Sequence, residues 1–339
     1  MKEDKIILAI ESSCDETACA IIKNEELLAN VISSQIEVHQ KYGGVMPEIA
    51  SRLHLENILY VIDDALSKAN IKLEEVSAFA ITRGPGLIGA LHVGLQAIKT
   101  LALIYNKPII PVHHLAGHIY ANEFVSPLKF PCLAIVVSGG NTELVYMKEH
   151  LDFKVIGETK DDAIGESFDK VARVMGLPYP GGVAIDKLAK LGKHTYKLPT
   201  LMHDGTLNIS YSGLKTAVIN LVHKEEQNGK KINVNDLARS VLDVAVDELL
   251  LRVKKATSEY DVKQIVLAGG VSANSYLRSE ITRIYDGSNI EVIIPPLWCT
   301  TDNAAMIAKV ASYLYDKKIF APLSLSVDPS WKIEDYLKF

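Results

Sequence analysis

Short apolar runs separated by polar turns fill the first third of the sequence. The runs are rich in Ile, Leu, Val and Ala, which favours strands, and one amphipathic stretch begins at Pro47, a residue suited to the first turn of a helix. The pattern predicts three strands, a helix, a strand, a helix and a strand, in this order: residues 5–10, 17–22, 26–32, 47–70, 76–82, 87–106 and 109–112.

The same order recurs further along the chain. It predicts strands over 132–137, 142–147, 153–158, 262–268 and 291–294, and helices over 166–175, 213–222, 234–259 and 272–285, with a last helix from about 301. Strands alternating with helices indicate α/β layers with ligands at the strand ends. We therefore expect two related halves that face each other across a central cleft. The expected domains are 1–125, completed by 301–339, and 126–300.

Length and charge limit the class of protein. Typical domains hold roughly 100–200 residues, so 339 residues fit two domains. Lys and Arg total 36 against 41 for Asp and Glu, a formal net charge of −5. This balance argues against a general polyanion binder, and a nucleic-acid function would need a local basic patch.

Cysteine usage and the N-terminal sequence indicate the compartment. The four cysteines are scattered and form no CxxC pair, which argues against a zinc ribbon and fits a reducing environment. The N-terminus lacks the pattern of a signal peptide, and no apolar run approaches the ~20 residues of a membrane span. We expect a cytoplasmic protein without a membrane partner.

Two histidines four residues apart are the first candidate site. On a helix, His114 and His118 share one face and can bind a single metal ion, although two histidines with local partners are the plainer interpretation. Asp302, before the last predicted helix, is a candidate third ligand. Two imidazoles and one carboxylate suit catalytic iron(II) or zinc. The zincin HExxH motif has a Glu as general base where this chain has Leu115, which counts against a protease.

Glycine turns and carboxylates supply further candidates. Glycine pairs occur at 139–140, 181–182 and 269–270, where the backbone can approach a phosphate, although plain turns are the more common meaning. The Walker motif GxxxxGK[ST] is not present. Among the acidic residues, Asp161 and Asp162 are expected to be simply solvated, whereas Asp169 and Asp186 lie beside glycine turns.

Taken together, these segments resemble the bacterial TsaD family, the tRNA threonylcarbamoyladenosine transferases of the actin-like ATPase superfamily. The matching segments run in order from about Ile7 to Ala308 and include IESSCDETACAI, YGGVMPEIASRLH, GPGLIGALHVG, PVHHLAGH, VSGGNT, GESFDKVAR, YPGG, SYSGLK, LAGGVSAN and TDNAAMIA. The resemblance implies two duplicated actin-like ATPase (ribonuclease H-like) domains. It also implies transfer of threonylcarbamoyl from threonylcarbamoyl-AMP to the N6 amine of adenosine 37 in tRNAs that read codons beginning with A, with release of AMP.

The resemblance also assigns roles to residues. It implies metal ligands at His114, His118 and Asp302, and a catalytic role for Asp15 and Glu16. The substrate-binding positions it implies are Val136, Val137, Ser138, Gly139, Gly140, Asp169, Gly182, Asp186 and Asn274. The implied ion is iron(II), with zinc as the alternative, and the implied partners are a TsaB-like paralogue and a TsaE-like ATPase.

One residue departs from the usual bacterial pattern, and two other functions stay open. Asn141 stands where bacterial members usually carry His, which puts any side-chain role there in doubt. Lys187, Lys190, Lys193 and Lys197 could form a basic strip, or simply a solvated helix face. The alternatives are a metalloprotease and a non-catalytic nucleotide-binding scaffold, which could dispense with the metal ligands.

Overall fold

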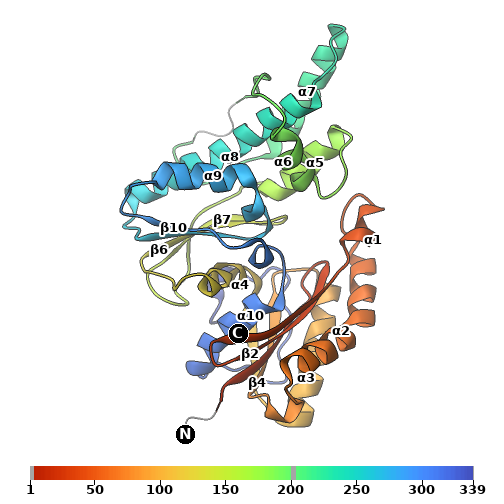
Figure 1. Ribbon diagram of the computed structural model, residues 1–339, viewed down its shortest axis with the longest axis vertical. Coiled ribbons are helices and arrows are strands. Elements are labelled where there is room, and N and C mark those ends of the chain that lie inside the picture. The colour runs from red at the N-terminus through yellow and green to blue at the C-terminus, as the bar shows by residue number, and fades with distance from the viewer. Residues whose placement is uncertain (1–3, 200–203, 339) are drawn as a thin grey trace. The chain divides into compact units, whose positions relative to one another are not determined.

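The computed structural model describes residues 4–199 and 204–338 and divides the chain into two compact units (Figure 1). Unit 1 comprises Met1–Val125 and Thr301–Phe339, and unit 2 comprises Ser126–Thr300. Unit 1 is therefore discontinuous, because its last segment follows unit 2 in the sequence.

Unit 1 is built on a mixed five-stranded sheet in the order β3-β2-β1-β4-β5. β1 pairs antiparallel with β2 and parallel with β4, which places it at the centre of the sheet. Every residue of β1 is buried, whereas the edge strand β3 is mostly half-exposed. The strands are β1 (Ile6–Glu11), β2 (Glu16–Lys23), β3 (Glu26–Ser34), β4 (Ala78–Gly84) and β5 (Ile109–His113).

Helices cover both faces of this sheet. Alternate side chains of β1, such as Ile6, Leu8 and Ile10, pack into a cluster with α2 (Pro47–Ala69) and α3 (Ile88–Tyr105). On the other face lie α10 (Ala304–Asp316) and α4 (His114–Tyr120), which contact each other (Figure 1). The short α1 (Ile36–Gln40) precedes α2. The last segment of the chain thus supplies a central layer of unit 1.

Unit 2 repeats this topology. Its sheet has the order β10-β9-β6-β7-β8, with β6 antiparallel to β7 and parallel to β9, as β1 is to β2 and β4 in unit 1. The strands are β6 (Cys132–Val137), β7 (Thr142–Met147), β8 (Lys154–Glu158), β9 (Gln264–Ala268) and β10 (Glu291–Ile293). The duplicated α/β fold expected from the sequence is confirmed.

Five helices of unit 2 pack into one core with this sheet. They are α5 (Ile164–Val174), α6 (Gly181–Ala189), α7 (Ser212–Gln227), α8 (Val234–Glu259) and α9 (Ser275–Tyr285). α6 was not predicted, because its first two residues are the glycine pair that indicated a turn. α7 runs to Gln227 and so continues past residue 222, where the predicted helix ended.

Among the described residues, α3 is the one helix long and apolar enough to cross a membrane by length and composition. Its buried side chains, including Leu91, Leu95 and Ile98, pack in or beside the core of unit 1. One face of α3 therefore packs against the core of unit 1.

Candidate metal centre and substrate-binding residues

Helix α4 begins directly after β5 and carries both candidate histidines. His113 is its N-cap, and its Nδ1 accepts a hydrogen bond from Leu115 N at 3.2 Å. At Gly117 a Cβ would lie 2.9 Å from Cδ1 of Ile307, so glycine allows α10 to approach α4 closely. Asp302 stands just before α10, and this close packing carries its carboxylate to the histidines.

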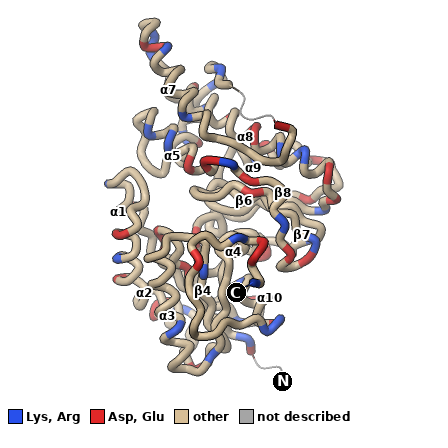
Figure 2. Tube along the Cα trace, turned by 180° about the vertical axis from the view of Figure 1, so that it is seen from behind, with Lys and Arg blue, Asp and Glu red and all other residues tan. Residues whose placement is uncertain are grey.

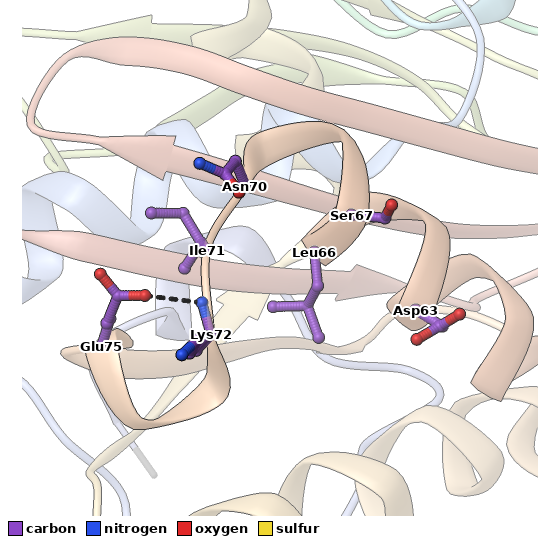
Figure 3. Close-up of a pocket in the computed structure, with 7 residues that line it drawn as sticks. All are labelled: Asp63, Leu66, Ser67, Asn70, Ile71, Lys72 and Glu75. Carbon is purple, nitrogen blue, oxygen red and sulfur yellow. Dashed lines mark hydrogen bonds between the residues drawn. The ribbon is translucent and has the colours of Figure 1, made fainter.

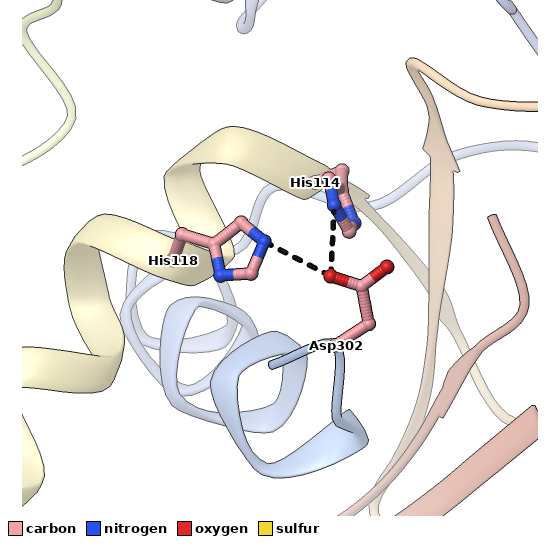
Figure 4. A group of neighbouring side chains, drawn as sticks. All are labelled: His114, His118 and Asp302. Atoms are coloured by element: carbon pink, nitrogen blue, oxygen red, sulfur yellow. Dashed lines mark ion pairs between the residues drawn. The ribbon is translucent and has the colours of Figure 1, made fainter. Parts of the chain in front are cut away.

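The three candidate ligands meet in unit 1 (Figure 4). Asp302 Oδ1 lies 3.1 Å from His118 Nε2 and 3.4 Å from His114 Nε2. The imidazole rings are nearly perpendicular, with centroids 4.7 Å apart. One nitrogen or oxygen atom from each residue lies within 4.8 Å of the others, so all three can face one ion.

His118 gives an independent indication of a ligand. Both ring nitrogens are buried, and neither makes a hydrogen bond with the residues that the structure describes. Nε2 lies 3.1 Å from Asp302 Oδ1, but in a direction unsuited to a hydrogen bond. A buried polar atom without a partner costs about 1–3 kcal/mol. An ion bound to Nε2 would offset part of this cost, so the residues present fit a metal.

The other nitrogen of His114 faces a buried carboxylate. His114 Nδ1 lies 2.9 Å from Glu11 Oε2 and 3.2 Å from Ser13 Oγ. Glu11 also accepts hydrogen bonds from Thr82 Oγ1 at 2.7 Å and from Ser13 N at 2.5 Å. These contacts were not predicted from the sequence. The available signal was a carboxylate at the end of an otherwise apolar buried strand.

The charges of this group are strongly coupled. Burial opposes the charged form of His114, but Asp302 and Glu11 outweigh burial and raise its pKa well above the usual value. Burial likewise opposes the charge of Asp302 and of Glu11, and in both cases His114 lowers the pKa below the usual value. An ion placed between these groups would replace the proton that His114 otherwise holds.

Asp15 and Glu16 lie beside the same aspartate. One carboxylate oxygen from each of Asp15, Glu16 and Asp302 falls within a 4.8 Å group that can also hold a cation. Burial, followed by repulsion from Asp302 and Asp15, raises the pKa of Glu16 to about 10. His54 holds the segment that carries Asp15 and Glu16, because its ring nitrogens contact Thr17 Oγ1 at 2.8 Å and the Cys14 carbonyl oxygen at 2.9 Å.

In unit 2, two glycine turns meet at the ends of β6 and β9. Gly269 has φ +87°, and a Cβ there would lie 2.5 Å from the Val137 carbonyl oxygen. The 138–141 turn is closed by Ser138, whose N–H donates to the Asn141 carbonyl at 2.9 Å and whose Oγ accepts from Asn141 N at 3.0 Å. A Cβ at Gly139 or Gly140 would meet nothing within 4 Å, so this backbone is open to a ligand.

The remaining candidate residues lie at two helix N-termini or in the core. Asp169 accepts from Gly181 N at 2.6 Å at the start of α6, where Gly182 follows. Asp186 accepts from Ser275 N at 3.2 Å, and Asn274 caps the same helix, α9. Two further candidates, Val136 and Val137, lie in β6 with fully buried side chains. Only their backbone groups could therefore contact a substrate.

The prediction that Asp161 is simply solvated is wrong. Its carboxylate accepts hydrogen bonds from Tyr211 N at 2.7 Å, from Ser212 N at 3.1 Å and from the Ser210 hydroxyl. These donors lie at the start of α7, so Asp161 fixes the beginning of that helix. Asp162 pairs with Lys170 at 2.6 Å.

Positions of Lys and Arg and positions of Asp and Glu are interspersed over unit 2 (Figure 2). Within the expected basic strip, Lys190 is paired with Asp186 at 3.1 Å. An open surface hollow of about 750 Å³ lies elsewhere, at the C-terminal end of α2 (Figure 3). Its Glu75 carboxylate accepts from the Lys72 backbone N–H at 2.8 Å, so this acidic group closes a local turn.

Comparisons with known proteins agree with this architecture. The chain is 51% identical to the tRNA N6-adenosine threonylcarbamoyltransferase of Bacillus anthracis, over 98% of each chain. It is 50% identical to the enzyme of Bacillus subtilis (strain 168), over 99% of this chain and 98% of that one.

Two solved structures share the actin-like ATPase fold at low sequence identity. Component A of (R)-2-hydroxyglutaryl-CoA dehydratase from Acidaminococcus fermentans has a TM-score of 0.54 at 16% identity, covering 92% of this chain and 98% of that one. T. kodakarensis HypF has a TM-score of 0.64 at 12% identity, covering 94% and 49%. The profile of the TsaD family, described as tRNA N6-adenosine threonylcarbamoyltransferase, matches residues 26–309. With this match and with relatives half identical over almost the whole length, the chain belongs to the TsaD family of tRNA-modifying transferases.

Proposed function

We propose that this transferase uses threonylcarbamoyl-AMP as donor and the N6 amine of adenosine 37 as acceptor, in tRNAs that read codons beginning with A. The amine nitrogen forms a bond to the carbamoyl carbon, the bond from that carbon to the phosphate oxygen breaks, and AMP leaves while the amine loses a proton. The observation that carries the proposal is the group formed by His114, His118 and Asp302.

We assign the metal to these three residues and propose iron(II), with zinc as the alternative. Two imidazoles and one carboxylate leave coordination positions open, as in catalytic sites. The ion supplies Lewis-acid polarisation of a bound oxygen. The chain itself keeps the ligands in place through the packing of α4 against α10 and through the buried contacts of His114.

The binding site for the AMP part of threonylcarbamoyl-AMP is assigned to unit 2. The exposed backbone of Gly139 and Gly140 offers N–H groups that suit a phosphate. The N-terminus of α9, where Asp186 and Asn274 gather, adds the positive end of a helix dipole. Asp169 and Gly182 complete the proposed substrate set, together with the backbone of Val136, Val137 and Ser138.

Asp15 and Glu16 are assigned the proton transfer. The acceptor amine is a poor nucleophile because its lone pair is delocalised into the purine, and it must lose a proton as the new bond forms. We propose that the carboxylate of Asp15, held in a fixed turn, accepts that proton, because the raised pKa of Glu16 leaves that group protonated near neutral pH and able to donate a hydrogen bond. One oxygen of Asp302 lies within 4.8 Å of one oxygen of each of these two residues, which places the proposed base beside the proposed metal ligands.

Partners and compartment follow from the proposed reaction. Because the formal net charge of the chain is −5, a TsaB-like paralogue and a TsaE-like ATPase are proposed to supply part of the positive charge that binds tRNA. The enzyme is proposed to act in the cytoplasm, where its tRNA substrate is found.

The test is a reconstituted reaction with tRNA, threonylcarbamoyl-AMP and the proposed partners. Replacement of both His114 and His118 by Ala is expected to abolish threonylcarbamoyladenosine formation, measured by mass spectrometry of the tRNA nucleosides. His92→Ala, at an exposed position of α3, is the matched control and should keep full activity. Unchanged product from the double variant would refute the metal assignment. Metal-dependent cleavage of a protein substrate would favour the protease alternative.

A further inference from the structure

We propose that Glu11 is a positioning residue that fixes the tautomer of His114, so that Nδ1 carries the proton and Nε2 is free to bind the metal. This inference rests on the proposed metal centre and adds to it a residue outside the ligand set. The direction of each hydrogen bond to the Glu11 carboxylate decides which nitrogen of His114 carries the proton.

Glu11 is fully buried at the end of the central strand β1. Its Oε1 accepts from Ser13 N at 2.5 Å, a bond whose direction is fixed because a backbone N–H can only donate. Its Oε2 faces Thr82 Oγ1 at 2.7 Å and His114 Nδ1 at 2.9 Å. An ionised carboxylate can only accept, so His114 must donate from Nδ1.

The direction of this bond decides what the other nitrogen can do. A neutral imidazole that carries its proton on Nδ1 has a lone pair on Nε2, the atom that faces Asp302 at 3.4 Å. Metal-binding histidines commonly donate their second N–H to a carboxylate, which sets the tautomer and the ring orientation. Among the described residues, no hydrogen-bond partner fixes the tautomer of His118. Of the two histidines, only His114 has a carboxylate that fixes its tautomer.

The change Glu11→Gln tests the inference with little change in shape. The amide oxygen can satisfy Ser13 N–H only if the amide NH₂ faces His114 Nδ1, which would move the imidazole proton to Nε2, the nitrogen needed for the ion. The opposite orientation keeps the imidazole proton on Nδ1 but brings two donors together at Ser13, so the arrangement that can bind the metal is disfavoured. Zinc affinity is therefore expected to fall 10–100-fold, the usual range for partners of metal ligands. The measurement is competition with a chromogenic chelator on the full-length protein.

The matched control is Thr82→Val, which removes another donor to Glu11 Oε2 and leaves the Glu11–His114 contact in place. Its zinc affinity should fall by much less than the 10–100-fold expected for Glu11→Gln, since the direction of the His114 bond is unchanged. If Thr82→Val lowered the zinc affinity as much as Glu11→Gln, the effect would come from a general disturbance of the strand ends, and the proposed role of Glu11 would be refuted.

A spectroscopic readout keeps the inference testable if Glu11→Gln does not fold. In the zinc-loaded wild type, ¹⁵N-labelled imidazole spectra should show His114 with an exchange-protected proton on Nδ1 and the metal on Nε2. Metal on Nδ1 would overturn the proposal. Normal zinc binding by a folded Glu11→Gln variant would also overturn it while leaving the metal centre intact, whereas failure of the wild type to bind any metal would instead refute the proposed function.

Discussion

The buried His113 offers a sharp test of how the last segment of the chain supports α4. Its Nδ1 caps the helix, and its Nε2 lies 2.8 Å from the Trp331 carbonyl oxygen, to which it donates. His113→Phe keeps a ring but removes both bonds. Loss of the cap costs about 1 kcal/mol, and a buried carbonyl left without a partner costs about 1–3 kcal/mol. The variant should therefore unfold with a free energy about 2–4 kcal/mol lower at pH 7.

The penalty should depend on pH in a defined direction. Burial lowers the pKa of His113 to about 3, whereas an unfolded histidine has a pKa of about 6.5. Between these pH values the unfolded state binds a proton that the folded state does not bind. The contribution of neutral His113 to the free energy of unfolding is therefore complete above about pH 6.5 and is lost as the pH falls toward 3. At pH 5 the loss is about 2 kcal/mol, from about 1.36 kcal/mol per pH unit. Phenylalanine does not titrate, so the variant's penalty should shrink by that amount.

The assay is urea unfolding of metal-free protein at pH 7 and pH 5. The chain has two tryptophans, so a Trp298→Phe background leaves Trp331, beside His113, as the only tryptophan fluorophore. His114 is present with and without the His113→Phe change, so the effect of its own protonation largely cancels when the two free energies of unfolding are subtracted. An equal penalty at the two pH values would refute the assignment of a neutral buried His113.

Three further predictions concern other parts of the chain. Gly269→Ala places a Cβ 2.5 Å from the Val137 carbonyl oxygen, and calorimetry should show weaker AMP binding than for Gly270→Ala, where there is open space. Asp161→Ala removes the acceptor at the start of α7, so amide exchange there should accelerate while that of α8 stays unchanged. Zinc at 100 times its Kd should raise the free energy of unfolding by about 2.7 kcal/mol in wild type; His118→Ala should show much less, and an equal gain would contradict its role as a ligand.

Local patterns predicted the regular elements well. The strands β6 and β7 and the helix α8 have the predicted bounds, since apolar runs, turn residues and the Asn233 cap are all local signals. α6 was missed because its N-terminus is stabilised by Asp169, a contact across 12 residues. Asp161 was misjudged for a similar reason, because its donors lie 49–51 residues further along.

The candidate site shows the same limit. Helical spacing alone put His114 and His118 on one face, and the structure brings Asp302 to them, while their metal-binding role stays a prediction. Glu11 lies 103 residues before His114, and no periodicity links two positions so far apart. Long-range partners of ligands become visible only when the sheet brings the strand ends together.

The discontinuity of unit 1 orders events during translation. Unit 2 is continuous, so all of its residues leave the ribosome before Asp302 does. A nascent chain that has already exposed His114 and His118 cannot yet assemble all three ligands, because Asp302 has not been synthesised. The hydrogen bond from His113 to the Trp331 carbonyl forms later still. A polypeptide released before residue 302 would lack the aspartate, so full metal loading reports that synthesis passed that point.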